Sequence, residues 1–90
     1  MTDHEVTEKL VAFIQENLLP DDQDDIMVDE TTPLLDLGVL DSLKTAILLN
    51  FIRRELKVEV PPQALSARNF IDVRNITNMI TSLEVTATNS

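Results

Sequence analysis

The sequence predicts an all-α fold, a four-helix bundle with a long loop between its first and second helices and a short third helix. Apolar residues recur at helical spacing in three long segments. Only residues 58–60 alternate like a strand, and no second strand is available to pair with them. Pro61 and Pro62 follow directly, so this stretch is predicted to be an extended linker.

The first helix is predicted to begin at Thr2 or Asp3. Thr2 and Glu5 have the spacing of a capping box, in which a side chain accepts from a free backbone N–H. Apolar residues then recur on one face, and Pro20 ends the helix: Val6, Leu10, Phe13, Ile14 and Leu18. His4 is predicted to be solvated at the helix start, where a lone histidine forms no metal site.

Residues 19–40 are predicted to form the long connection. The acids of residues 21–25 resemble the start of a calcium loop, but both registers lack the glycine that such a loop requires. A loop of this length in a small domain is usually functional or held down by side chains. Five apolar residues are predicted to anchor it on the helices: Ile26, Val28, Leu34, Leu35 and Leu37.

Asp41 is a good N-cap for a second helix running from Ser42 to about Leu56. One apolar stripe of this helix is predicted to face the core: Leu48, Leu49, Ile52 and Leu56, with Thr45 among them. A second stripe is left over: Leu43, Ile47 and Phe51, flanked by Ala46. Either the long loop covers this second stripe, or part of it, chiefly Leu43 and Ala46, is a docking surface beside Ser42.

Two further helices are predicted after the linker. Residues 65–70 are long enough for a short third helix. Asp72 can cap a last helix whose apolar residues share one face: Val73, Ile76, Met79, Ile80 and Leu83. Residues 1–85 are therefore predicted to be one domain, and residues 86–90 a disordered tail.

The composition and charge of the chain restrict the classes of function that it can have. Ninety residues form one small domain, and the 43% of hydrophobic residues include only three phenylalanines and no tryptophan or tyrosine. There is no cysteine, no long apolar run and no basic-then-apolar leader, so we expect a cytoplasmic monomer. The net charge is −9, and residues 1–30 hold ten acids against Lys9. Such acidity argues against binding nucleic acid and favours partners with basic surfaces.

Ser42 is the most informative residue. It follows the stretch Pro-Leu-Leu-Asp-Leu-Gly-Val-Leu-Asp of residues 33–41, at the first turn of a strongly apolar helix. A phosphate on its hydroxyl would lie beside the partial positive charge of a helix N-terminus. The chain has no nearby histidine base, no metal cluster and only one glycine. Ser42 is therefore predicted to be modified by another enzyme rather than to be catalytic.

Residues 33–43 resemble the attachment site of acyl and peptidyl carrier proteins, and the resemblance extends from Val6 to Leu83. In that family a phosphopantetheinyl transferase attaches 4′-phosphopantetheine from coenzyme A to the serine. The resemblance implies that Ser42 carries the cofactor and that Asp41 helps to organise the transferase's metal–coenzyme site. It implies a loop role for Gly38, through backbone freedom or close packing. The docking residues that it implies are Leu40, Leu43, Ala46 and Ile47.

Two departures from the commonest family pattern indicate which type of carrier this chain resembles. Val39 and Leu40 separate the glycine from Asp-Ser, where most carriers have one residue. This spacing resembles stand-alone carriers of the D-alanyl and the prolyl or pyrrolyl type. The helix from Ser42 to Leu56 holds Lys44, Arg53 and Arg54 against Glu55, whereas fatty-acid carriers usually present acids there. An apolar docking contact is therefore expected.

The leading hypothesis is a stand-alone aminoacyl or peptidyl carrier in natural-product biosynthesis. We expect it to be loaded by a separate adenylating enzyme and to serve a downstream tailoring or acyl-transfer enzyme. A fatty-acid or polyketide acyl carrier is the first alternative, and a D-alanyl carrier the second. An alternative from a different functional class is that the chain is an unmodified helical interaction module, in which Ser42 only begins a helix.

Overall fold

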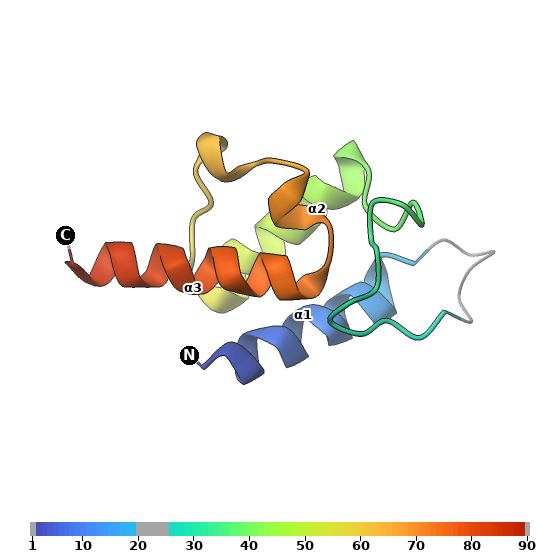
Figure 1. The fold of residues 1–90 in the computed structure, drawn as a ribbon, viewed down its shortest axis with the longest axis horizontal. Helices are drawn as coiled ribbons and strands as arrows, with labels where there is room; N and C mark the ends of the chain where they lie inside the picture. The colour runs from blue at the N-terminus through green and yellow to red at the C-terminus, as the bar shows by residue number, and fades with distance from the viewer. Residues whose placement is uncertain (1, 20–25, 90) are drawn as a thin grey trace.

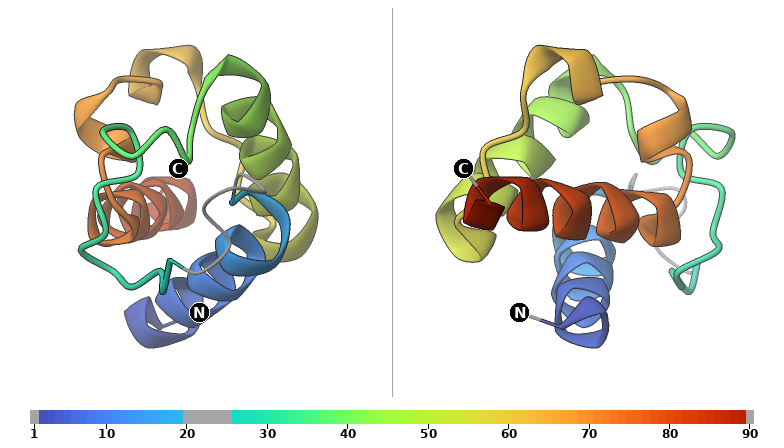
Figure 2. Two further views of the ribbon diagram at one scale, coloured as in Figure 1. Left: turned by 90° about the vertical axis from the view of Figure 1, so that its right-hand side faces the viewer. Right: turned by 60° about the vertical axis from the view of Figure 1, so that its left-hand side comes forward.

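The structure is a computed structural model that describes residues 2–19 and 26–89, with side chains to residue 83. Three α-helices account for most of it: α1 (Asp3–Asn17), α2 (Ser42–Phe51) and α3 (Val73–Asn89). Figure 1 shows α3 lying across α1, with α2 behind them, and the views of Figure 2 show the three helices around a common interior. No strand occurs in the described ranges, and the all-α prediction is confirmed.

The first helix begins as predicted. Thr2 is its N-cap, and the Thr2 hydroxyl oxygen accepts a hydrogen bond of 3.2 Å from the backbone N–H of Glu5. Buried residues recur every four positions along it: Val6, Leu10, Ile14 and, just after the helix, Leu18. This spacing places them on one face, and that face packs against α3. His4 is exposed and pairs with Glu8 at 2.9 Å.

The second helix has the predicted bounds but not a uniform geometry. Ser42–Phe51 is α-helical and Ile52–Leu56 forms a π-helical turn, designated η2. Lys57 then ends the helix in the left-handed conformation, with φ of 60°. The core stripe is confirmed for Leu48, Ile52 and Leu56, which are buried, whereas its other two members, Leu49 and Thr45, are half-buried. Residues 58–61 form no helix or paired strand, and Pro61 has an extended backbone, as expected for a linker.

The predicted short third helix over residues 65–70 is not found as one continuous helix. Residues 62–70 form two short 3₁₀ turns instead, η3 (Pro62–Ala64) and η4 (Arg68–Phe70). Asn69 explains why an α-helix does not form, since its side-chain amide donates to the Ala64 carbonyl at 2.8 Å. Such side-chain bonds to nearby backbone compete with helical hydrogen bonds. The described chain thus has three α-helices and short helical turns, and the fourth helix of the predicted bundle is not confirmed.

The core is aliphatic and lies between the three helices. Besides the buried residues of α1, α2 and η2 and Leu18, its members come from the loop, the linker, η4 and α3: Val28, Leu34, Val39, Leu40, Val58, Phe70, Val73, Ile76, Met79 and Ile80. Phe13 of α1 stacks on Phe51 of α2, with ring centroids 4.1 Å apart. Part of the second apolar stripe of α2 is therefore covered by α1 and not by the loop.

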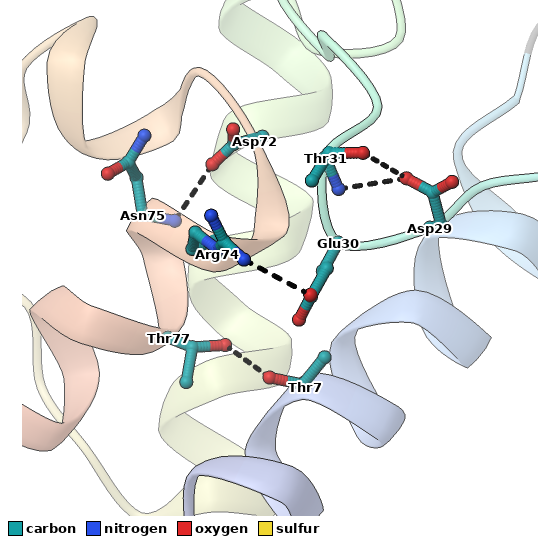
Figure 3. A network of polar contacts seen from close by, with 8 residues as sticks. All are labelled: Thr7, Asp29, Glu30, Thr31, Asp72, Arg74, Asn75 and Thr77. Carbon is teal, nitrogen blue, oxygen red and sulfur yellow. Dashed lines mark hydrogen bonds and ion pairs between the residues drawn. The ribbon is translucent and has the colours of Figure 1, made fainter.

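Polar contacts attach the long loop to the helices. The Gln15 side chain of α1 donates to the Ile26 carbonyl at 2.8 Å and accepts from the Val28 N–H at 2.7 Å. On the other side, Glu30 forms an ion pair of 3.5 Å with Arg74 of α3. Figure 3 shows this pair beside the Thr7–Thr77 hydrogen bond of 3.0 Å, which joins α1 to α3. Residues 26–30 of the loop are therefore held against both α1 and α3, as the length of the loop suggested.

One of the five predicted loop anchors differs from the prediction. Leu37 is exposed, because it lies at the tip of a turn in which its N–H donates to the Pro33 carbonyl. Leu34 lies fully in the core, and Val39 and Leu40 are buried after the turn. The acidic segment that was compared with a calcium loop lies outside the described residues.

The last helix is capped by Asp72, whose carboxylate accepts from the Asn75 N–H at 2.8 Å (Figure 3). Its predicted apolar face is confirmed by the buried side chains Val73, Ile76, Met79 and Ile80. The backbone stays helical to Asn89, beyond the end predicted at residue 85. Residues 85–89 contain neither glycine nor proline, so nothing local stops the helical hydrogen bonding. The division into a domain and a tail at residue 85 stays a prediction.

Candidate functional site

The site is built by the tight turn that precedes α2. Leu34 is central to it, because its carbonyl accepts hydrogen bonds from the N–H groups of Val39 (2.9 Å) and Leu40 (3.2 Å). Gly38 allows the turn with a φ of 73°, in the left-handed region. A Cβ added at Gly38 would meet no atom within 4 Å. Of the two roles considered for this glycine, backbone freedom is therefore the one required here.

Asp41 ends the turn and caps α2. It has an extended backbone, and its carboxylate accepts a hydrogen bond of 2.8 Å from the Lys44 N–H. Its carbonyl accepts from the Thr45 N–H at 2.8 Å, the first bond of the helix. Ser42 is consequently the first residue of α2, and its side chain is exposed. The hydroxyl makes no hydrogen bond to any described residue.

The surroundings of Ser42 fit a phosphate ester. Within the described ranges nothing accepts from the backbone N–H groups of Ser42 and Leu43, so both remain at the open end of the helix. Free N–H groups and the helix dipole favour an anion at this position. The Asp41 carboxylate opposes that preference, and it already accepts from one N–H of this helix end, that of Lys44. A phosphodiester on the Ser42 oxygen would have both room and donors.

A cavity of about 520 Å³ opens beside Ser42. One wall is the face of α2 that carries Thr45, Ala46 and Leu49, and the other is made by the segment between η3 and η4. That second wall consists of Leu65, Ser66, Ala67 and Phe70. The mixture of hydroxyl and apolar groups suits a flexible arm containing amide bonds. Sequence reasoning missed this wall, although Leu65 stands out there as a large apolar residue that is 46% exposed.

The predicted docking residues divide into two groups. Leu43 is 70% exposed, Ile47 is 41% exposed, and Ala46 is also exposed, so these three form an apolar surface next to Ser42. Leu40 is only 4% exposed and belongs to the core, which corrects its assignment as a docking residue. The hydrogen bond from its N–H to the Leu34 carbonyl keeps Leu40 folded under the turn.

Other kinds of site are not apparent in this part of the chain. Among the described residues no group of three or more histidine, cysteine, aspartate or glutamate side chains could hold a metal ion. Asp29, far from Ser42 in the loop, has its pKa lowered, chiefly by hydrogen bonds from Thr31 and also from Thr32 (Figure 3). No helix within residues 2–19 and 26–89 is long and apolar enough to cross a membrane.

Comparison with known proteins agrees with this geometry. The family described as "Phosphopantetheine attachment site" matches residues 8–81. The "Probable acyl carrier protein PigG" of Serratia sp. (strain ATCC 39006) is 30% identical over 76 residues, which are 84% of this chain and 85% of that protein.

A solved chain matches with a TM-score of 0.72 and 36% identity, over 81% of this chain and 100% of its own length. The structure that contains it is named "Crystal structure of FAD-dependent dehydrogenase". The family match covers the turn, α2 and the cavity wall described above. This chain belongs to the phosphopantetheine-binding family of carrier proteins.

Proposed function

We propose that this carrier holds an aminoacyl group as a thioester on a 4′-phosphopantetheine arm attached to Ser42. The observation that supports Ser42 most directly is its exposed, unbonded hydroxyl at the first position of α2, inside the matched residues. When bound, the cofactor supplies a thiol that the cysteine-free chain lacks. The residues of the chain supply the attachment oxygen, the helix N-terminus and the surface that partners recognise.

The attachment chemistry follows from the position of the hydroxyl. The Ser42 Oγ attacks the phosphorus of coenzyme A that carries the pantetheine, and a new P–Oγ bond forms. The bond to the departing adenosine 3′,5′-bisphosphate breaks, and the serine proton passes to a base of the transferase. We propose that Asp41 contributes from the adjacent position, by facing the metal ion that the transferase and coenzyme A share.

Intact mass spectrometry tests the attachment. The purified chain is incubated with coenzyme A, Mg²⁺ and a broad-specificity phosphopantetheinyl transferase. One phosphopantetheinyl group should be added, and Ser42→Ala should abolish the addition. Ser66→Ala is the matched control, because Ser66 lines the same cavity and its variant should still gain the group. Addition to the Ser42→Ala chain would refute the assignment.

We propose that Leu43, Ala46 and Ile47 form the surface on which the transferase and the later enzymes dock. The three side chains are exposed on consecutive turns of α2 and adjoin Ser42, so a partner covering them would bring its active site to the arm. Apolar groups with exposed neighbours of this kind are typical of partner contacts.

We propose that an amino-acid-activating enzyme acts on this carrier first and that a flavin-dependent dehydrogenase acts on it afterwards. The first forms an aminoacyl adenylate with ATP and transfers the acyl group to the thiol. The second is suggested by the 36% identical chain, because the solved structure in which that chain occurs is one of an FAD-dependent dehydrogenase. Each desaturation of the tethered group would move two hydrogens to FAD and give FADH₂. The prolyl and pyrrolyl cargoes implied by the Gly-Val-Leu-Asp-Ser spacing suit such an oxidation.

Loading assays separate this proposal from its alternatives. The modified chain is offered to a proline-activating enzyme, a D-alanine-activating enzyme and a malonyl transferase, each with its substrate. We expect prolyl loading, followed by a loss of two hydrogens for each FAD reduced when the dehydrogenase is added without oxygen. Loading with D-alanine alone would favour cell-wall modification. Ready malonyl transfer without aminoacyl loading would favour a fatty-acid or polyketide carrier.

A further inference from the structure

The exposed side of α2 and of η2 forms one continuous stripe. Exposed side chains recur once in every turn along it: Leu43, Ala46, Ile47, Asn50, Arg53 and Arg54. The intervening residues Leu48 and Ile52 are buried, so the stripe stays on the solvent-facing side along both α2 and η2. It begins beside Ser42 and ends at the π-helical turn.

The chemistry of this stripe changes along its length. Its first two turns are apolar and its last turn is cationic. Eleven residues separate Ser42 from Arg53, which at 1.5 Å per residue is about 16 Å. Arg54 follows Leu43 and Ile47 at spacings that keep all three on one line of the helix. A partner that covers the apolar end would therefore also face the guanidinium groups.

The two arginines are not used to hold the fold together. Arg53 donates to the Asn50 side chain at 3.1 Å, and Arg54 has no hydrogen bond or ion pair with the rest of the described chain. Arg74, by contrast, pairs with Glu30. Glu59 lines a cavity of about 260 Å³ together with Arg53, and the exposed Glu55 follows Arg54 in η2 without forming an ion pair with it.

We propose that the enzyme which loads this carrier has an apolar recess at its entrance and carboxylates about 16 Å away that bind Arg54 and Arg53. The proposal rests on the proposed function. The net charge of −9 would repel an acidic surface at long range. Screening limits that repulsion to about 8 Å at physiological salt. The cations at the contact therefore decide whether the electrostatic interaction with the partner is attractive. Asp41 lies at the opposite end of the stripe, before the first turn of α2, so the two ends of the stripe differ in charge.

Charge reversal at matched positions tests this surface. Arg54→Glu and Arg68→Glu change the net charge equally, and both side chains are exposed. Arg68 lines a separate cavity with Asn78 and Met79 of α3. Each variant is first converted to the modified form, checked by intact mass and by thermal unfolding. Its kcat/KM is then measured with the proline- or D-alanine-activating enzyme, whichever loads the wild-type chain, at physiological ionic strength and at about 1 M NaCl.

We expect Arg54→Glu to lower kcat/KM about tenfold at physiological salt, and Arg68→Glu to change it less than twofold. Loading of the wild-type chain should slow as NaCl rises, and loading of Arg54→Glu should not. Equal effects of the two reversals, or faster wild-type loading at high salt, would overturn the proposed acidic partner while leaving the attachment at Ser42 intact. No mass increase on the wild-type chain would instead refute the proposed function. Loading by neither enzyme would refute the aminoacyl cargo and this partner together.

Discussion

Truncation of Leu48 tests which stripe of α2 belongs to the core. Leu48 is fully buried in the middle of α2, so Leu48→Ala removes apolar groups where little can move in to replace them. Such substitutions cost about 2–5 kcal/mol. A chain of this size has a total stability of roughly 5–13 kcal/mol, so the loss would be a large fraction of it. A loss of about 3 kcal/mol corresponds to a fall in Tm of roughly 12–24 °C.

Urea unfolding followed by far-UV circular dichroism measures this loss. Ala46→Glu is the matched control, because Ala46 lies two residues earlier on the same helix but is exposed. Its free energy of unfolding should change by no more than about 0.5 kcal/mol, whereas its loading by partner enzymes should fall. A similar loss of stability in the two variants, or a loss below about 1 kcal/mol for Leu48→Ala, would show that the stripes are assigned wrongly.

Three further predictions concern single polar or glycine positions. Asp41→Asn should unfold like the wild type, because asparagine caps equally well, yet should take up phosphopantetheine more slowly in a mass-resolved time course. Gly38→Ala should cost about 1–2 kcal/mol in urea unfolding, since φ is 73°. Hydrogen bonds lower the folded pKa of Asp29, so its contribution to stability is present above the unfolded value of 3.8 and is lost as pH falls through the folded pKa. Asp29→Asn should therefore unfold more easily at neutral pH, and the difference in thermal unfolding should vanish in acid.

The sequence by itself determined the features that depend on neighbouring residues. Thr2, Asp41 and Asp72 each cap a helix as predicted, because a cap involves only the next three positions. The buried face of α3 follows in the same way from the helical spacing of its apolar residues. The place of Ser42 at the start of α2 is another local consequence, and this is why Ser42 could be proposed as the attachment residue without a structure.

Only the tertiary structure decided which apolar groups are covered. Leu40 and Leu37 are close in sequence and alike in chemistry, yet one is in the core and the other at the tip of a turn. Phe51 is covered by Phe13, while Leu43 on the same stripe stays exposed. The cavity wall opposite Ser42 comes from residues more than twenty positions later in the chain. Periodicity gives the direction of a side chain from its own helix, but burial depends on what distant segments bring to that side.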